Sequence, residues 1–181
     1  EVMHRGAYYA ALSLDFFPDL GLKIRSVSHK KIVAQVFSKT PLTDSEQRYI
    51  FWSLTRWLGI WEDLSPFYRM VKAIPMIGQA VSILKGMHET RCLNVFEATA
   101  FCLALQRATS GRTLTIIERL CESMGARLRF DGIEVIAFPR AETVSILTEQ
   151  ELRSIAPLGY RAKYLLFNAK ALSRLRIDGG L

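Results

Sequence analysis

The sequence predicts an α+β protein, with a small N-terminal antiparallel sheet followed by a mainly α-helical domain that contains a short β-hairpin. Three observations support this prediction. Apolar residues alternate through the first forty residues, as they do in half-buried strands. From Thr43 onward the apolar period lengthens to about 3.6 residues, as it does in amphipathic helices. An Asp131-Gly132 pair between two short apolar runs indicates a tight hairpin turn.

The composition favours a basic protein with a sizeable core and without a metal site. Half of the 181 residues are hydrophobic, and the formal net charge is +7. Such a charge suggests a polyanionic partner, either nucleic acid or an acidic membrane surface. Cys92, Cys102 and Cys121 show no metal-ligand spacing, so we expect reduced core cysteines and no cofactor. The sequence has no signal-peptide pattern and no apolar run of about 20 residues.

The change of period near residue 43 is the predicted domain boundary. Residues 1–42 are expected to form an N-terminal antiparallel β domain, and residues 43–181 a helical domain. The strands are expected at three alternating runs, 8–14, 22–24 and 32–36. Helix starts are indicated by a capping residue followed three positions later by glutamate, or by a first-turn proline, at Thr43, Ser65-Pro66, Asn94 and Thr148.

A polar, basic loop is predicted between two helices at residues 106–112. The preceding run from Val95 to Leu105 is apolar almost all round, which is typical of a helix buried in the middle of a bundle. Ser110 is expected to cap the next helix, with Arg112 in its first turn. Backbone N–H groups and a cation at a helix start suit a phosphate. An ordinary solvated helix connection explains the same residues equally well.

The segment from Leu158 to Tyr164 places one aromatic and two cations at the start of the last helix. Gly159 permits a tight bend just before Tyr160, Arg161 and Lys163. An exposed aromatic can push between stacked bases while neighbouring cations meet base edges or phosphates. The commoner role of such a segment is an amphipathic surface, so the rest of the chain must decide between the two.

Several stretches resemble the helix-hairpin-helix DNA glycosylases, in particular their 8-oxoguanine and 3-methyladenine branches. The most specific stretch is Leu158-Gly159-Tyr160-Arg161-Ala162-Lys163-Tyr164. The others are Phe96-Glu97-Ala98, the 106–112 loop, Ile117-Glu118-Arg119-Leu120-Cys121 and the Phe138-Pro139 pair. The resemblance implies a DNA repair enzyme that bends duplex DNA, rotates a damaged nucleotide out of the stack and cleaves its N-glycosidic bond.

The resemblance also implies DNA-binding roles in the loop and in the last helix. Tyr160 would be the wedge that fills the vacated space, and Arg161 would hydrogen-bond the unpaired base. Arg107 would border the gap, at a position where the family often has asparagine, and Arg112 would lie near the lesion or a phosphate. The complete expected DNA-binding set is Gln106, Arg107, Ser110, Arg112, Tyr160, Arg161 and Lys163.

The catalytic residues of the family have no counterpart in this sequence. In these enzymes the helix-hairpin-helix and the catalytic Asp, with a nucleophilic Lys in bifunctional members, follow the segment that matches Leu158 to Tyr164. Here only a last helix, expected over 160–175, and Asp178-Gly179-Gly180 come after it. We therefore expect no catalytic residue in this chain and a helical domain that is incomplete at its C-terminus. The chain alone is then an inactive part of a longer DNA N-glycosylase, with or without AP lyase activity.

Three functional hypotheses remain open. The first is a base-excision repair glycosylase whose partner is double-stranded DNA containing a damaged base. We expect it to be a monomer without membrane or metal, located in the cytoplasm with the nucleoid or in a eukaryotic nucleus. The second is a non-catalytic DNA-binding or scaffolding module, and the third is a helical protein-interaction domain. Release of the damaged base distinguishes the first hypothesis from the second. DNA binding that is insensitive to salt and shows no preference for damaged over intact duplex favours the third.

Overall fold

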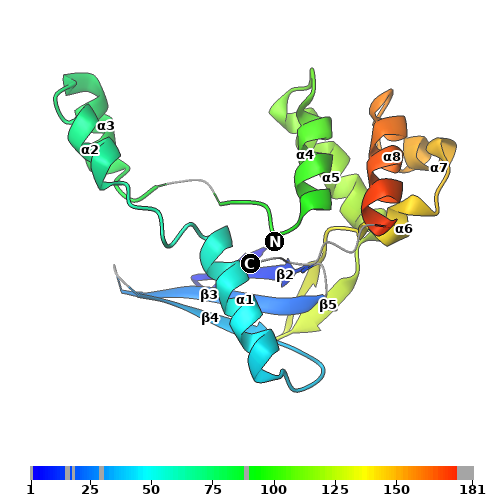
Figure 1. Cartoon of the computed structure of the whole chain (residues 1–181), viewed down its shortest axis with the longest axis horizontal. Coiled ribbons are helices and arrows are strands. Elements are labelled where there is room, and N and C mark those ends of the chain that lie inside the picture. Colours follow the sequence, from blue (N-terminus) through cyan, green and yellow to red (C-terminus); the bar gives the residue numbers. More distant parts are fainter. Residues whose placement is uncertain (1, 15–16, 18, 29–30, 88–89, 175–181) are drawn as a thin grey trace. The chain divides into compact units, whose positions relative to one another are not determined.

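The computed structural model describes residues 2–14, 17, 19–28, 31–87 and 90–174 (Figure 1). It confirms the predicted α+β class, because an N-terminal sheet is followed by helices and one further hairpin. The chain forms two compact units, one made of Glu1–Pro41 with Leu93–Leu181 and the other of Leu42–Cys92. The sheet therefore shares its unit with the later helices, and the second unit is inserted between them in the sequence.

A four-stranded antiparallel sheet forms the N-terminal part of the first unit. Its strands, in order across the sheet, are β1 (Val2–His4), β2 (Ala7–Leu12), β3 (Leu20–Ser28) and β4 (Lys31–Phe37). The sequence does not predict β1, because its three residues are all exposed and show no alternation. A turn at Arg5 and Gly6, with φ of 47° and 73°, connects β1 to β2. Glycine adopts this left-handed conformation at little cost.

The predicted Asp-Gly hairpin is confirmed, and its strands are β5 (Arg127–Phe130) and β6 (Ile133–Ile136). Asp131 and Gly132 form the turn with φ of 50° and 75°, as a type I′ turn requires. The Phe130 ring packs against Gly21 of β3, where an added Cβ would lie 2.5 Å from the ring. The absence of a side chain in β3 therefore lets the hairpin approach the sheet closely.

The tip of this hairpin is tied to the sheet by a carboxylate. Asp131 Oδ2 accepts hydrogen bonds from the Tyr9 hydroxyl at 2.8 Å and from Lys23 Nζ at 2.5 Å. Both donors favour the ionised carboxylate, so the hydrogen bonds from Lys23 and then Tyr9 lower the pKa of Asp131 from its ordinary value. The same hydrogen bond with Asp131 raises the pKa of Lys23.

We expect this carboxylate to contribute to the acid sensitivity of the fold. A depressed folded-state pKa contributes stability that is fully present above the unfolded pKa of about 4 and is lost as the pH falls through the folded value. Asp131→Asn should therefore lower the melting temperature at about pH 7, and this effect should shrink as the pH falls below about 4 through the lowered pKa of Asp131. Thermal melts followed by circular dichroism across this range measure the difference. An effect of equal size at every pH would contradict the expectation.

The described residues of the first unit also form five helices. They are α4 (Val95–Leu105), α5 (Ser110–Met124), α6 (Ala141–Ser145), α7 (Glu149–Ile155) and α8 (Arg161–Arg174). As predicted, Asn94 caps α4 and Thr148 caps α7, each side chain accepting a hydrogen bond from the N–H three residues on. The sequence does not predict α6, because its five residues are too few to show a helical period. The predicted end of the last helix and the glycines after it, residues 175–181, lie outside the described residues.

Helix α4 buries one face, which corrects the prediction that it is buried all round. Phe96, Ala100 and Ala104 are buried and lie four residues apart, whereas Cys102 and Leu105 are exposed. The two alanines permit close approach of the neighbouring helices. The core on that side also contains Ile116, Leu120, Ala162, Leu165 and Ala169. When a helix is apolar on every side, its sequence pattern does not indicate which face will be buried.

The cysteines are less buried than the sequence predicts. Cys92 and Cys102 are exposed, and Cys121 is half-buried. An apolar helical neighbourhood places Cys102 on α4 but does not assign it to the buried face, and Cys92 lies before the start of that helix. The prediction of core cysteines is therefore wrong for Cys92 and Cys102.

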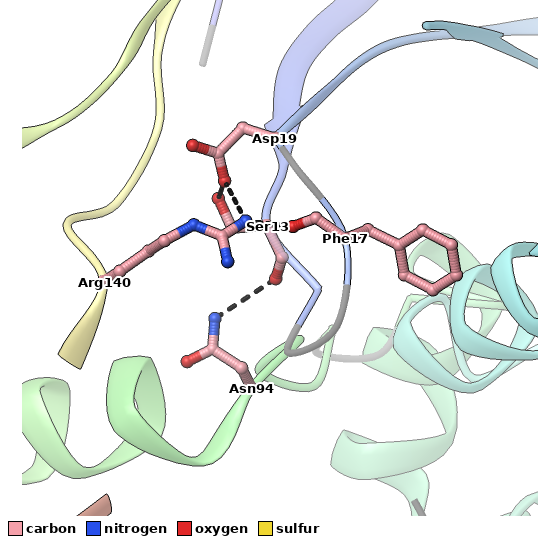
Figure 2. Close-up of polar contacts among 5 residues, drawn as sticks. All are labelled: Ser13, Phe17, Asp19, Asn94 and Arg140. Atoms are coloured by element: carbon pink, nitrogen blue, oxygen red, sulfur yellow. Dashed lines mark hydrogen bonds and ion pairs between the residues drawn. The ribbon is translucent and has the colours of Figure 1, made fainter. Parts of the chain in front are cut away.

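A polar cluster joins the connection between β2 and β3 to the helices of the same unit (Figure 2). Asp19 Oδ1 accepts from the Ser13 hydroxyl at 2.8 Å and from Arg140 Nη2 at 3.1 Å. The same Arg140 nitrogen donates to the Phe17 carbonyl. Asn94 Nδ2 donates to the Ser13 carbonyl at 3.2 Å, so the cap of α4 also holds this connection. The cluster thereby fixes the start of α4 and the approach to α6 on the sheet.

The second unit contains α1 (Asp44–Trp57), α2 (Ser65–Val71) and α3 (Pro75–Ile83). The predicted capping box of α1 is confirmed, because Thr43 and Glu46 each accept a hydrogen bond from the other's backbone N–H. Ser65 is the first residue of α2 rather than its cap, and the Asp63 carboxylate accepts from the Ser65 N–H at 2.9 Å. Within the described ranges, no helix is both long enough and apolar enough to cross a membrane.

Candidate nucleic-acid interface

The loop between α4 and α5 is short and turns sharply at Arg107. The φ of Arg107 is 46°, in the left-handed region that side chains other than glycine, asparagine and aspartate rarely adopt. Thr109 caps α5, since its hydroxyl accepts from the Arg112 N–H at 3.4 Å. This corrects the expectation that Ser110 is the cap, because Ser110 is the first residue of the helix. Because Thr109 and Ser110 both carry a hydroxyl, the sequence leaves the position of the cap uncertain by one residue.

Four carbonyls at the end of α4 accept hydrogen bonds from outside the regular helical pattern. The Leu103 carbonyl accepts from Arg161 Nε at 3.0 Å, and the Ala104 carbonyl accepts from the Thr113 hydroxyl at 3.3 Å. The Leu105 carbonyl accepts from the Ala108 N–H at 3.3 Å. The Gln106 carbonyl accepts from Arg161 Nη2. The end of α4 is therefore held by side chains from both α5 and α8.

Arg161 is a buried cation at this helix end. Its exposed fraction is 4%. Besides the carbonyls of Leu103 and Gln106, its guanidinium donates to the Leu158 carbonyl at 3.4 Å. A positive charge is stabilised at the C-terminus of a helix, where the backbone dipoles present their negative ends. In this DNA-free structure the guanidinium thus points into the protein, and its expected contact with an unpaired base remains a prediction.

Tyr160 lies on the surface beside this buried cation. Its exposed fraction is 45%, and it follows Gly159, whose φ of 57° makes the bend that the sequence predicts. The Arg161 guanidinium carbon lies 4.8 Å from the centre of the Tyr160 ring, as in a cation–π contact. The Tyr164 ring packs edge-on against Tyr160 at 6.5 Å, and Lys163 Nζ lies 4.8 Å from the centre of the Tyr164 ring.

The structure brings the two predicted DNA-binding segments together. The α4–α5 loop and the start of α8 lie at the same end of these helices, at the top of Figure 1, and Arg161 joins them through the carbonyls of Leu103 and Gln106. Arg112 Nη2 adds a contact at 3.5 Å with the Pro157 carbonyl, just before α8. Among the described residues, none forms a hydrogen bond or an ion pair with the side chain of Arg107.

Six of the seven predicted DNA-binding residues are exposed, and Arg161 is the exception. The exposed residues are Gln106, Arg107, Ser110, Arg112, Tyr160 and Lys163. Two residues of the site were not predicted. Tyr164 is four residues after Tyr160, and that spacing could have placed it on the same face. Thr113, which is buried and caps α4, gives no signal in the sequence because its partner is a backbone carbonyl.

The described residues contain no group of three or more His, Cys, Asp or Glu side chains that could hold a metal ion. The site instead combines an exposed aromatic with cations and backbone groups held in a fixed arrangement. Such a surface is chemically suited to an anionic, aromatic partner such as a nucleic acid.

The chain is similar in sequence and in fold to several DNA glycosylases. The DNA-3-methyladenine glycosylase of Bacillus subtilis strain 168 is 21% identical over 161 residues, which are 88% of this chain and 52% of that protein. The 3-methyladenine DNA-glycosylase of Archaeoglobus fulgidus matches with a TM-score of 0.77 and 18% identity, over 93% of this chain and 57% of that chain. No protein-family model matches the sequence.

The 8-oxoguanine glycosylase/lyase of Clostridium acetobutylicum also shares the fold. Its structure with double-stranded DNA containing cytosine opposite 8-oxoG matches with a TM-score of 0.60 and 14% identity, over 94% of this chain and 58% of that chain. The predicted resemblance to the 3-methyladenine and 8-oxoguanine glycosylases is thus confirmed, and the shared feature is the fold. The chain spans little more than half the length of each of these proteins.

Proposed function

We propose that this chain is the DNA-probing part of a base-excision DNA N-glycosylase that binds damaged duplex DNA and turns the damaged base out of the stack. One observation supports this proposal most directly. Tyr160 is exposed on a turn whose next residue, Arg161, is anchored in the protein by three backbone carbonyls. A side chain that separates two bases must resist being pushed back, and an anchored turn provides that resistance.

Extruding a nucleotide costs a few kcal/mol of lost stacking and pairing. An aromatic ring in the vacated space restores stacking with the flanking bases, and such contacts are worth about 1–3 kcal/mol per base. In this proposal Tyr160 is that ring. Tyr164 packs against its edge and supports it from the protein side.

The exposed polar residues around Tyr160 are proposed to hold the DNA backbone and the edge of the gap. Arg107 and Arg112 lie on the α4–α5 side, and Lys163 lies on α8. Gln106 and Ser110 add exposed polar side chains on the same loop. The left-handed φ of Arg107 is consistent with such a role, because backbone strain of about 1–3 kcal/mol tends to occur at functional sites.

In the intact protein we propose that the bound base is released by hydrolysis of its N-glycosidic bond. The relatives with this fold are glycosylases, and in this proposal the catalytic residues lie outside the 181-residue chain. Incubating the protein from its native source with duplexes containing alkylated or oxidised bases tests this step, with the 181-residue chain as the matched control. Release by the native protein alone is the expected result. Release by neither, together with tight binding to damaged DNA, would favour a non-catalytic DNA-binding module.

The binding step is testable with the 181-residue chain itself. We expect tighter binding to a duplex containing an abasic-site analogue than to the intact duplex of the same sequence, because a base is already missing where Tyr160 enters. We also expect the affinity to fall steeply with salt, since phosphate contacts release counterions. Fluorescence anisotropy with both duplexes over a salt series measures both effects. Equal affinity for the two duplexes would contradict the proposal.

Arg107→Asn is expected to weaken binding without loss of stability. Asparagine tolerates the left-handed backbone conformation, so the loop is preserved while the cation is removed. If Arg107 contacts a phosphate, the slope of log affinity against log salt should decrease by about 1. Arg129→Asn, which removes an exposed arginine from β5, is the control and should leave the slope unchanged. An unchanged slope for Arg107→Asn would exclude the phosphate contact.

A further inference from the structure

We propose that Arg161 is a positioning residue that locks Tyr160 and the α4–α5 loop into one rigid surface before DNA binds. This inference rests on the proposed DNA-probing function and specifies how its surface is built. It differs from a direct contact between Arg161 and the unpaired base, because the residue acts here through Tyr160 and through the loop.

The lock is visible in the partners of the guanidinium. Nε donates to the Leu103 carbonyl at 3.0 Å, and Nη2 donates to the Gln106 carbonyl. Those carbonyls stand 58 and 55 residues before Arg161 in the sequence, so the two bonds join distant segments. Nη1 donates to the Leu158 carbonyl at 3.4 Å, on the far side of the Gly159 bend. One side chain therefore ties together the end of α4, the start of the loop and the turn that carries Tyr160.

The orientation of Tyr160 depends on the same group. Its ring packs against the Arg161 guanidinium at 4.8 Å and against the Tyr164 ring at 6.5 Å. Because Arg161 is only 4% exposed and its guanidinium is held by three carbonyls, it offers the ring a fixed platform. Removing the guanidinium would leave Tyr160 one fewer contact and would remove the donor of the Gln106 carbonyl, whereas the Leu103 carbonyl would keep the Gln106 N–H at 3.2 Å.

A base contact by Arg161 would require a different arrangement. The guanidinium would have to leave its carbonyl partners at a helix end where a cation is favoured. The Gln106 carbonyl would then lose its side-chain donor, and the Leu103 and Leu158 carbonyls would keep only the backbone N–H groups of Gln106 and Arg161. The planar fork of arginine is suited to several fixed acceptors at once, whereas a lysine ammonium is a single compact donor group. Arg161→Lys therefore keeps the charge and most of the stem while breaking the lock.

The test uses Arg161→Lys, Tyr160→Leu and the double variant of the 181-residue chain. The preference for an abasic-site duplex over intact duplex is measured with each of the four bases opposite the abasic site, and with no base opposite. Arg140→Lys is the matched control, because Arg140 also bonds a backbone carbonyl in the same unit but belongs to the cluster at Asp19. Hydrogen exchange of the DNA-free protein is followed in peptides covering 103–112 and in peptides of the sheet.

If Arg161 acts as a positioning residue, Arg161→Lys lowers the preference for the abasic-site duplex on the order of tenfold. The loss should be the same whichever base lies opposite the abasic site, and the same when no base lies there. In the Tyr160→Leu background the same change should cost less than about twofold, because the two residues act through each other. Exchange in 103–112 should accelerate roughly tenfold, equivalent to ~1.4 kcal/mol, while the sheet is unchanged. Arg140→Lys should leave the preference and the loop exchange as they are.

Three results would overturn the inference. A loss confined to duplexes with a base opposite the abasic site would show a direct base contact. Additive effects of the Arg161 and Tyr160 changes would show that Arg161 does not act through Tyr160. Unchanged exchange in 103–112 would show that the loop is not held by Arg161. If the wild-type chain has no abasic-site preference, the proposed function fails, and the exchange measurement still tests the lock.

Discussion

Replacing Tyr160 with alanine is expected to lower the affinity for an abasic-site duplex by about 5- to 150-fold, equivalent to ~1–3 kcal/mol of lost stacking. The affinity for intact duplex should change much less, because phosphate contacts by the neighbouring cations persist. Anisotropy titrations with the two duplexes measure the ratio directly. The effect should be large because the ring is exposed to the partner yet held by Arg161 and Tyr164 on the protein side.

Two control variants make this result specific. Tyr160→Phe keeps the ring and should retain most of the preference. Phe167→Ala removes a more exposed aromatic from α8, the helix that follows Tyr160, with an exposed fraction of 71%, and should leave the preference unchanged. If Phe167→Ala reduces the preference as strongly as Tyr160→Ala, general hydrophobicity of α8 explains binding better than a wedge.

The largest effect on stability is expected from Gly125→Ala. A Cβ at this position would lie 2.2 Å from the Ala137 carbonyl oxygen and 2.6 Å from the Cys121 carbonyl oxygen. Both obstacles are backbone atoms, one in α5 itself and one in the segment after β6, so relief requires moving the backbone at residue 125 away from both. Overpacking of this kind costs about 1–3 kcal/mol or more. Chemical denaturation followed by circular dichroism gives the change in the free energy of unfolding.

Gly111→Ala is the matched control for this variant. A Cβ at Gly111 meets no atom within 4 Å, and the residue lies in the first turn of the same helix. Alanine is favoured over glycine in a helix by up to ~1 kcal/mol, so this change should leave stability equal or higher. Equal destabilisation by the two substitutions would mean that the close approach at Gly125 is not the cause.

The helix caps, the hairpin turn and the close approach at Gly125 are predictable from the sequence to different degrees. The capping residues Thr43, Asn94 and Thr148 and the Asp131-Gly132 turn were predictable because their structure depends on neighbours within three residues. The sequence alone does not show why residue 125 is a glycine. Glycine often ends a helix in a left-handed bend, but the φ of −72° at Gly125 shows that close backbone approach explains this glycine.

In the candidate site too, features that depend on neighbouring residues were predictable, and features that depend on distant residues were not. Tyr160 and the loop from 106 to 112 were found from local residue types and from the resemblance to DNA glycosylases. The carbonyl partners of Arg161 lie 55 and 58 residues earlier, so no local pattern could reveal that its side chain turns inward. The covered face of α4 was also unpredictable, since only the packing of α5 and α8 distinguishes Ala100 and Ala104 from Cys102.

The polar cluster around Asp19 has a consequence for how the protein is made. Ser13 and Asp19 precede their partners Asn94 and Arg140 by 81 and 121 residues. At about 5–20 residues per second, roughly 6–24 seconds of synthesis separate Asp19 from Arg140. For much of that interval the sheet is complete in sequence, but the β5–β6 hairpin that packs against it does not yet exist. Slow translation should therefore prolong an aggregation-prone state, and the yield of folded protein should depend on chaperones more than on its final stability.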